Sequence, residues 1–325
     1  MGHVLGLFHH HSRNDRDKYI TLMLGAIDAI WRAQYAKELF SENYGVGYDY
    51  GSVMHYSGYK PQSDSIEMVA KEKKYQHTMG NNYGPMFTDL LAINKYYNCA
   101  SRCSNGAECK NGGFRNSRRC EECICPNGFG GADCAERAAG EGDASADCGA
   151  SVQADSDWQT LNGSVETKAF PKGRHFSDRS AGCHFHIKAP ADARIEMELV
   201  FIDGTCSPDC YFGALDIKVD DMTKGGIRAC CDSHREDIGK LVSARELIVM
   251  SLYTQKDKRV FSVRYRIYEE ETSTQPSSTF FTQLDVVEQN FGGIIFSSES
   301  TLTSTSSTTT SITSKPNCAD ASGFK

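Results

Sequence analysis

Fourteen cysteines, and the places where they lie, constrain this 325-residue chain more than any other feature of its sequence. None precedes Cys99, six fall within 103–134, six more fall within 148–231, and Cys318 stands alone near the end. This density is typical of small modules that disulfides stabilise in oxidising compartments. We therefore expect a disulfide-bonded, secreted, extracellular protein, although residues 1–20 lack the pattern of a signal peptide.

A zinc-binding cysteine module is the alternative interpretation of the same residues. Cys120 and Cys123 have the Cys-x-x-Cys spacing of a metal-binding pair. Such a module needs a second pair at matching spacing, and Cys123-x-Cys125 does not supply it. The sequence therefore favours disulfides.

Composition divides the chain into five segments with boundaries at 1–99, 100–134, 135–147, 148–268 and 269–325. The first is rich in Tyr and Met and indicates mixed helix and loop. The second holds the first six clustered cysteines, and the third is a small, polar, acidic stretch that predicts a flexible linker. The fourth predicts a β domain and the fifth a low-complexity tail. The predicted fold class is multidomain α+β.

Helices are expected in two parts of the first segment. Residues 19–40 and 87–97 place apolar side chains at helical spacing among helix-forming residues. Loops punctuated by Gly and Asn separate them.

Period-two alternation predicts antiparallel strands in the fourth segment. Along 194–203 glutamates alternate with an apolar set that should share one face, namely Ile195, Met197, Leu199 and Phe201. Residues 215–219 and 261–267 alternate in the same way. Several short strands of this kind favour a sandwich or barrel.

The composition of the last segment and the overall charge limit the structures and partners that the sequence allows. Between 297 and 314, 15 of 18 residues are Ser or Thr, which predicts a disordered, O-glycosylated stalk. Asn162 begins an N-glycosylation sequon. The net charge of −7 argues against a nucleic-acid partner, and no apolar run is long enough for a membrane span.

The histidines near the N-terminus have metal-ligand spacing. His3-x-x-Gly6-x-x-His9 matches the second half of the long zinc motif of metalloproteases. The glycine is needed because the chain must turn back sharply between the two ligands, and Gly6 can adopt a positive φ. His10 and His11 are neighbours and not necessarily ligands. A purification tag is the alternative, but structured-looking sequence follows these histidines directly.

A resemblance to a known family extends this motif. Ser52-Val53-Met54-His55-Tyr56 is similar to the methionine turn of the astacin family of metzincin zinc endopeptidases. "GLFHHHSRNDRDKYI" and "YQHTMGNNYGPMFTDLLAINKYY" also resemble that family, so the first segment looks like the C-terminal half of its catalytic domain. Residues 109–134 are similar to an epidermal-growth-factor-like (EGF-like) module, and residues 148–268 resemble a CUB β-sandwich. This order is familiar from nematode astacins.

The resemblance implies a site with one Zn²⁺. His3 and His9 correspond to zinc-binding imidazoles, and Met54 to an apolar floor beneath the metal. Tyr56 corresponds to an outer zinc ligand that also stabilises the transition state by donating a hydrogen bond. Without the resemblance, Tyr56 would be interpreted as a half-buried loop tyrosine.

The same resemblance indicates what this sequence lacks. The family's first zinc histidine and its catalytic glutamate would precede Met1, so we expect an N-terminally truncated sequence without peptidase activity. His10 stands where the family has a glutamate that anchors the mature N-terminus, and histidine cannot form that ion pair in the same way at neutral pH.

Disulfide pairs are likewise implied by the EGF-like resemblance alone. They are Cys103–Cys120, Cys109–Cys123 and Cys125–Cys134. Six further disulfide cysteines are expected without an assigned pairing: Cys148, Cys183, Cys206, Cys210, Cys230 and Cys231. The family's partner for Cys99 lies near the start of its catalytic domain, so Cys99 is expected to lack its partner here, and Cys318 is unassigned.

Two functional hypotheses remain open. The first is a secreted zinc metalloendopeptidase that hydrolyses extracellular proteins, with matrix or cuticle proteins as candidate substrates. The second is a non-catalytic binding or adhesion protein that acts through its CUB and EGF-like modules. The zinc-site residues favour the first, and the missing glutamate and His10 favour the second.

Overall fold

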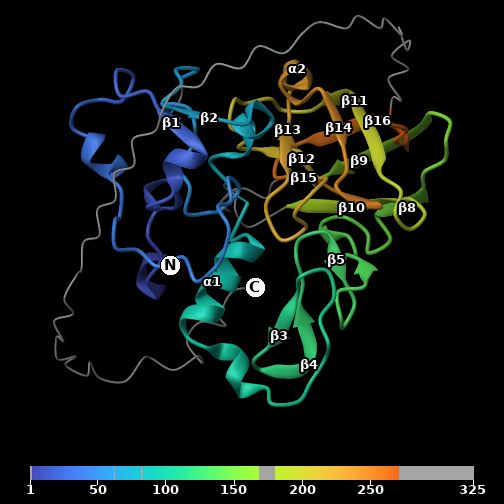
Figure 1. The fold of residues 1–325 in the computed structure, drawn as a ribbon. Helices are drawn as coiled ribbons and strands as arrows, with labels where there is room; N and C mark the ends of the chain where they lie inside the picture. The colour runs from blue at the N-terminus through green and yellow to red at the C-terminus, as the bar shows by residue number, and fades with distance from the viewer. Residues whose placement is uncertain (1, 62, 82, 168–179, 271–325) are drawn as a thin grey trace, which may run out of the picture. The chain divides into compact units, whose positions relative to one another are not determined.

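The N-terminal segment, residues 2–98, is built mostly from loops and short 3-10 helices. The computed structural model describes residues 2–61, 63–81, 83–167 and 180–270 (Figure 1). The 3-10 helices of this segment are η1 (Gly2–Leu5), η2 (His10–Ser12), η3 (Arg16–Lys18), η4 (Arg32–Tyr35) and η5 (Lys73–Thr78). Strands β1 (Ile20–Leu22) and β2 (Met68–Ala70) pair antiparallel, and α1 (Phe87–Tyr96) ends the segment.

The helix predicted for residues 19–40 is wrong, whereas the helix predicted for 87–97 is confirmed as α1. Residues 19–40 are all described and contain β1, turns and η4, with no α-helix. β-branched Ile20 and Thr21 favour an extended backbone, and β2 offers them hydrogen-bond partners. Gly25 then interrupts any helical continuation. Tertiary pairing therefore overrides the helical spacing of the apolar residues.

The cysteine module, residues 99–134, is a disulfide-bonded hairpin with little apolar core. It contains η6 (Cys99–Arg102), β3 (Phe114–Asn116), β4 (Arg119–Ile124) and β5 (Phe129–Gly130), and β3 pairs with β4. The three implied pairs are confirmed: Cys103–Cys120, Cys109–Cys123 and Cys125–Cys134. Cys99 is disulfide-bonded too, so the expectation that it lacks a partner in this chain is wrong.

The stretch expected as a flexible linker, 135–147, contains two short strands instead. β6 (Glu136–Arg137) pairs with β5, and β7 (Glu141–Gly142) pairs with β10 (Ala181–Lys188). Arg137 also donates to the carbonyl oxygen of Cys148 at 2.8 Å. Backbone pairing on both sides fixes this acidic stretch despite its linker-like composition.

Two mainly antiparallel sheets pack face to face, and their strands, within residues 141–166 and 181–267, are here called the sandwich. One sheet runs β13 (Ile227–Ala229), β12 (Gly213–Lys218), β15 (Leu247–Thr254), β10 and β7, with β8 (Gly149–Gln153) pairing parallel to β10. The other runs β14 (Lys240–Val242), β11 (Ile195–Asp203), β16 (Lys258–Ile267) and β9 (Gln159–Glu166). Short helices η8 (Asp232–His234) and α2 (Arg235–Ile238) precede β14. The predicted antiparallel strands at 194–203, 215–219 and 261–267 are confirmed.

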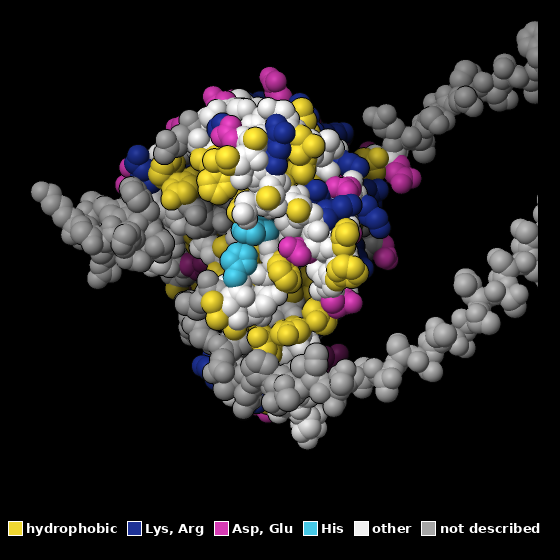
Figure 2. Space-filling model, turned by 90° about the vertical axis from the view of Figure 1, so that its left-hand side faces the viewer, with side chains coloured by type: hydrophobic (Ala, Val, Ile, Leu, Met, Phe, Trp, Pro, Cys, Tyr) yellow, Lys and Arg dark blue, Asp and Glu magenta, His cyan; other side chains and the backbone are white. Residues whose placement is uncertain are grey.

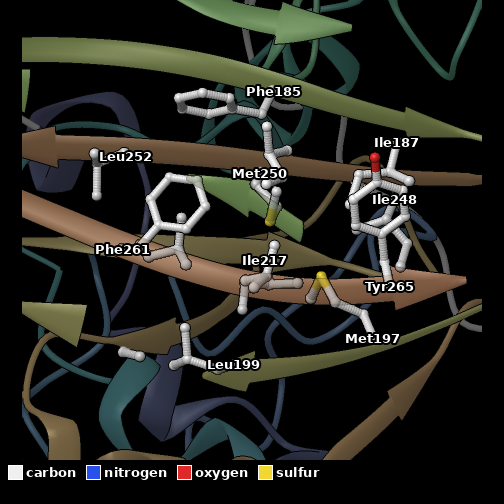
Figure 3. Packing of buried hydrophobic residues seen from close by; sticks show 14 of the residues in the cluster. Phe185, Ile187, Met197, Leu199, Ile217, Ile248, Met250, Leu252, Phe261 and Tyr265 are labelled. Atoms are coloured by element: carbon white, nitrogen blue, oxygen red, sulfur yellow. The ribbon is translucent and has the colours of Figure 1, made fainter. Parts of the chain in front are cut away.

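The sandwich core consists of apolar side chains contributed by alternate positions of both sheets (Figure 3). Figure 3 shows Phe185, Met250 and Phe261 meeting between the strands. Met197 and Ile217 are fully buried in the same cluster. Each such side chain contributes about 1.5–3 kcal/mol by leaving water.

One predicted core residue, Phe201, lies outside this core. Ile195, Met197 and Leu199 face inward as expected, but the register of β11 shifts between Leu199 and Phe201. A bulge adds a residue and moves subsequent side chains to the opposite face. Phe201 is consequently 40% exposed, and Ile202 is buried in its place.

Three disulfides stabilise the sandwich, and they use all six of the cysteines that were left unpaired. They are Cys148–Cys183, Cys206–Cys231 and Cys210–Cys230. The Ser/Thr-rich stretch 297–314 and Cys318 lie outside the described residues. Among described residues, no helix is long and apolar enough to cross a membrane.

Candidate metal centre

Residues 2–12 form a tight turn around Gly6. Helix η1 ends at Leu5, and the amide of Gly6 donates to the carbonyl oxygen of His3 at 3.0 Å. Gly6 has φ of +90°, as the motif spacing predicts. A side chain is strained at that backbone angle, so glycine is what allows His9 to return toward His3.

The two predicted imidazole ligands lie side by side. The ring centroids of His3 and His9 are 4.7 Å apart in an edge-to-face arrangement. Nδ1 of His3 donates to the carbonyl oxygen of Leu7 at 2.8 Å, and Nδ1 of His9 donates to that of Met54 at 3.3 Å. Carbonyl partners of this kind fix the tautomer of metal-binding histidines and leave Nε2 as the ligating nitrogen.

Met54, the residue predicted as an apolar floor, lies beside Gly2 and is bonded to His9 through its backbone carbonyl. It is buried, and a Cβ placed on Gly2 would come within 2.5 Å of its sulfur. A side chain at position 2 would therefore have to displace the end of Met54. The carbonyl oxygen of Met54 accepts from the amide of His10 at 2.8 Å as well as from His9. The methionine turn thus orients the second ligand directly.

Tyr56 lies beside His9 and His11. Its ring centroid lies 4.3 Å from that of His9 and 4.2 Å from that of His11. Its amide donates to Nδ1 of His11 at 3.3 Å. The ring of Tyr56 therefore borders one of the two predicted ligands, His9.

His10 and His11 are held by hydrogen bonds inside the protein, and the ring of His11 also lies beside that of His9, with centroids 5.0 Å apart. His11 is fully buried, and Nε2 of His10 accepts from the amide of Asp49 at 2.9 Å. Burial lowers the pKa of His10 well below its usual range and that of His11 to about 2, so both are neutral. Burial also lowers the pKa of His9, and a neutral imidazole is the form that binds metal.

An acidic residue missed by the sequence analysis holds the methionine turn in place. Asp89 of α1 accepts from the hydroxyl of Ser52 at 2.5 Å and from the amide of Val53 at 3.0 Å. It also caps its own helix by accepting from the amide of Met86 at 2.9 Å. An acidic side chain at the third position of a predicted helix is the signal that could have identified it.

The donors present fit a partial zinc site. Zinc accepts imidazole nitrogens and an oxygen donor in a tetrahedral set, and His3, His9 and Tyr56 provide three neighbouring side chains of those types. In the part of the chain that the structure describes, the one group of three His, Cys, Asp or Glu donors close enough for a metal is Cys210, Cys230 and His234. Two of those are joined in a disulfide, so that group is not a metal site.

Apolar side chains lie near histidine on one face of the surface. Figure 2 shows histidine on a face where hydrophobic side chains are gathered. Exposed hydrophobic residues of the N-terminal segment include Phe8 and Phe40, which line a cavity together with His9. A cavity of about 310 Å³ opens beside His9 and His10, bordered by Arg13 and Tyr96. A binding surface for an extended peptide has this mixture of apolar and polar lining.

The predicted glycosylation site lies apart from this cluster. Asn162 is exposed on β9, opposite Ser262 of β16. Its side chain is therefore accessible for modification.

Comparisons with known proteins agree with the resemblance in the N-terminal segment. Residues 1–98 match the Astacin peptidase family. The chain is 33% identical over 293 residues to zinc metalloproteinase nas-31 of Caenorhabditis elegans, covering 88% of this chain and 45% of that protein. It is 32% identical over 283 residues to zinc metalloproteinase nas-27 of the same nematode, covering 82% of this chain and 64% of that protein.

A solved structure gives a weaker match. High choriolytic enzyme 1, a hatching enzyme zinc-protease of the medaka fish Oryzias latipes, is 26% identical, with 30% of this chain and 48% of that chain covered and a TM-score of 0.28. The chain spans less than two thirds of the length of the nematode relatives above. Its homologues are nematode zinc metalloproteinases of the astacin family.

Proposed function

We propose that this chain is part of a secreted zinc metalloendopeptidase that hydrolyses peptide bonds of extracellular proteins. The observation that carries the proposal is that the ring of His9 lies beside those of His3 and Tyr56, with both imidazoles oriented by backbone carbonyls, that of Met54 among them. The astacin match over residues 1–98 supports it independently. Matrix or cuticle proteins are the substrate class that we propose.

Each side chain has a distinct part in this proposal. His3 and His9 hold the metal through Nε2, and Met54 excludes water from beneath it. The phenol of Tyr56 donates a hydrogen bond to charge that develops on the oxygen of the scissile carbonyl. When bound, zinc supplies an acidified water and polarises that carbonyl.

Peptidase activity needs two groups beyond these. A third imidazole and a general-base glutamate complete such a site in metalloproteases, and the base contributes about 10²–10⁴ in rate. Among the described residues, no acidic side chain joins His3 and His9 in a metal-sized group. We therefore propose that the whole protein supplies both groups from residues outside this sequence, and that the 325-residue chain has no measurable peptidase activity.

Localisation is part of the same proposal. The described disulfides, including Cys148–Cys183 and Cys210–Cys230, support an oxidising extracellular environment. Exposure of Asn162 supports N-glycosylation on the secretory route.

Metal binding by the full chain tests the proposal most directly. Co²⁺ titration followed by visible absorption reports nitrogen and oxygen ligands, and we expect His3→Ala and His9→Ala each to weaken binding by at least about tenfold. Val4→Ala is the matched control because Val4 is adjacent and 85% exposed. Equal Co²⁺ affinity in the unchanged chain and in both histidine variants would contradict the proposed site.

A second candidate function is non-catalytic binding through the sandwich and the cysteine module. The absence of an acidic residue beside His3 and His9 in the described chain favours it. Zinc-dependent cleavage of casein separates the two candidates, if it is measured on the chain and on a longer protein that restores the missing histidine and glutamate. Activity in the longer form alone supports the peptidase, and inactivity of both supports the binding protein.

A further inference from the structure

Asp49 is a buried carboxylate that the proposed chemistry does not use. It is 1% exposed and lies in the loop that leads to the methionine turn. Its oxygens accept from the amide of Gly51 at 2.8 Å and from the hydroxyl of Thr88 in α1 at 2.6 Å. A buried charge needs several donors to offset the loss of water, and these two come from the N-terminal segment itself.

The remaining donor of Asp49 belongs to the sandwich. The amide of Gly225, in the turn between β12 and β13, lies 3.0 and 3.1 Å from the two carboxylate oxygens. The approach is possible because two glycines face each other there: a Cβ on Gly225 would lie 2.9 Å from the Cα of Gly51. The turn is therefore shaped to reach this carboxylate.

Asp49 is also linked to the candidate metal centre. Its amide donates to Nε2 of His10 at 2.9 Å, and the amide of His10 donates to the carbonyl oxygen of Met54 at 2.8 Å. That carbonyl is the acceptor that orients His9. A continuous series of hydrogen bonds thus runs from Gly225 through Asp49 and His10 to the second proposed ligand.

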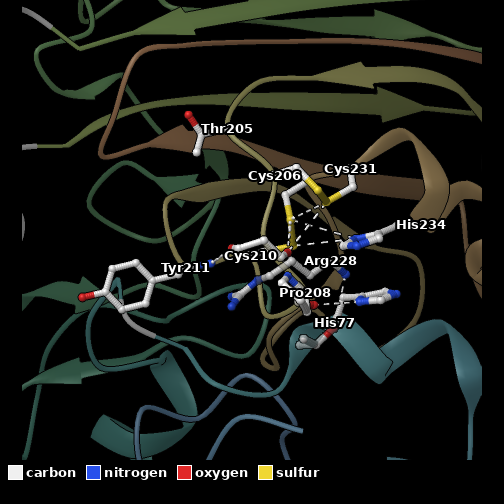
Figure 4. Close-up of a disulfide and its surroundings, with 12 residues drawn as sticks. His77, Thr205, Cys206, Pro208, Cys210, Tyr211, Arg228, Cys231 and His234 are labelled. Atoms are coloured by element: carbon white, nitrogen blue, oxygen red, sulfur yellow. Dashed lines mark hydrogen bonds between the residues drawn. A yellow bond between two sulfur atoms is a disulfide. The ribbon is translucent and has the colours of Figure 1, made fainter. Parts of the chain in front are cut away.

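Neighbouring contacts fix the position of the turn that carries Gly225. Thr78 of η5 donates to the carbonyl oxygen of Gly226 at 3.0 Å and accepts from the amide of Arg228 at 3.2 Å. His77 donates to the carbonyl oxygen of Pro208 at 2.8 Å and stacks on His234 with centroids 3.4 Å apart (Figure 4). Because η5 is attached at several points, the turn is held rigidly against the N-terminal segment.

From this geometry we propose that Asp49 is a positioning residue through which the β12–β13 turn of the sandwich orders the methionine turn and its ligand. In this proposal the sandwich orders the methionine turn of its own chain, in addition to any binding of an external partner. The inference rests on the proposed function only where it concerns metal, since the ordering of residues 48–56 is a property of the chain alone.

Two measurements on the full chain test the positioning role of Asp49 together: amide hydrogen exchange and Co²⁺ affinity. Gly225→Ala changes a residue that is remote from the candidate metal centre. In this variant we expect the amide hydrogens of His10, Gly51 and Met54 to exchange about tenfold faster. Asp49→Ala should give the same pattern, and Asp49→Asn, which keeps one acceptor oxygen, should give an intermediate one. Co²⁺ affinity should fall in the same order, by about tenfold at most for the alanine variants.

A matched control makes the result decisive. Gly25→Ala adds a methyl group where no atom lies within 4 Å. Acceleration of the same amides by Gly25→Ala as large as by Gly225→Ala, or no acceleration in Gly225→Ala and Asp49→Asn, would overturn the inference. If the unchanged chain fails to bind Co²⁺, the proposed metal site is wrong, while the exchange pattern still decides the role of Asp49.

Discussion

The large apolar cluster between the two sheets of the sandwich differs from the surroundings of the candidate metal centre, where many buried side chains are polar. The sandwich also buries polar side chains, such as Arg228 and Arg259, in addition to that cluster. His11, Asp49, Ser52 and His55 are each 3% exposed or less. Each is engaged in a hydrogen bond, as His55 is with the hydroxyl of Tyr48 at 2.7 Å. The stability of an apolar core depends on how completely its volume is filled and changes little with pH. The stability of a buried polar network depends on the presence of every hydrogen-bond partner and on the protonation state of its groups. Loss of side-chain volume should therefore destabilise the sandwich most, and a change in pH should destabilise the N-terminal segment most.

The largest effect is expected from a cavity in the sandwich. Phe261 is 1% exposed and packs edge-to-face on Phe185 with centroids 5.1 Å apart. Phe261→Ala should cost about 3–5 kcal/mol of the free energy of unfolding, because the surrounding sheets cannot collapse into the space. Urea unfolding measures it, with Val200→Ala, a change at a 42% exposed position, as the control. A loss under about 1 kcal/mol would mean that the sandwich core is not close-packed as described.

The polar network should instead respond to pH through Asp89. Burial raises the pKa of this carboxyl from 3.8 to about 6, despite the hydrogen bonds from Ser52 and Val53 that oppose the shift. The folded state then binds the proton more tightly than the unfolded state between those two values. The stabilisation is fully present below about pH 4 and is lost as pH rises through about 6, a change of up to about 3 kcal/mol.

Urea unfolding at pH 4 and pH 7 checks this, and Asp89→Asn is the matched variant because it keeps an acceptor but cannot titrate in this range. The difference between the two proteins should vary with pH in that window, with the aspartate form losing stability relative to asparagine as pH rises. A constant difference would show that Asp89 keeps its ordinary pKa. Phe261→Ala, by contrast, should shift stability by the same amount at both pH values.

Sequence patterns predicted those parts of the molecule that depend on a regular period or on a fixed motif. Alternation along 194–203 placed Met197 and Leu199 in the core, and the motif spacing brought His3 and His9 together around a glycine with positive φ. These predictions hold because a strand's side-chain period and a tight turn are set locally.

The sequence could not predict features that depend on distant partners. Residues 19–40 have helical spacing, yet β1 forms because β2 lies beside it. The role of Asp89 depends on the approach of the methionine turn, 37 residues earlier in the chain, and that of Asp49 on Gly225, 176 residues later. Contacts between residues so far apart in the chain produce no periodic pattern in the sequence.

At the bulge in β11, the alternation pattern of the sequence and the structure assign Phe201 to opposite faces of the strand. Simple alternation assigns Phe201 to the core, whereas the register shift buries Ile202 at 2% exposure and leaves Phe201 40% exposed. Phe201→Thr should therefore change the free energy of unfolding by no more than about 1 kcal/mol, since threonine suits an exposed strand. Ile202→Thr should cost more than about 2 kcal/mol, because it places a hydroxyl in the core. Urea unfolding of the two variants under one condition decides the register: the reverse order would place Phe201 inside and remove the bulge, because a slip of one residue exchanges the two faces of a strand.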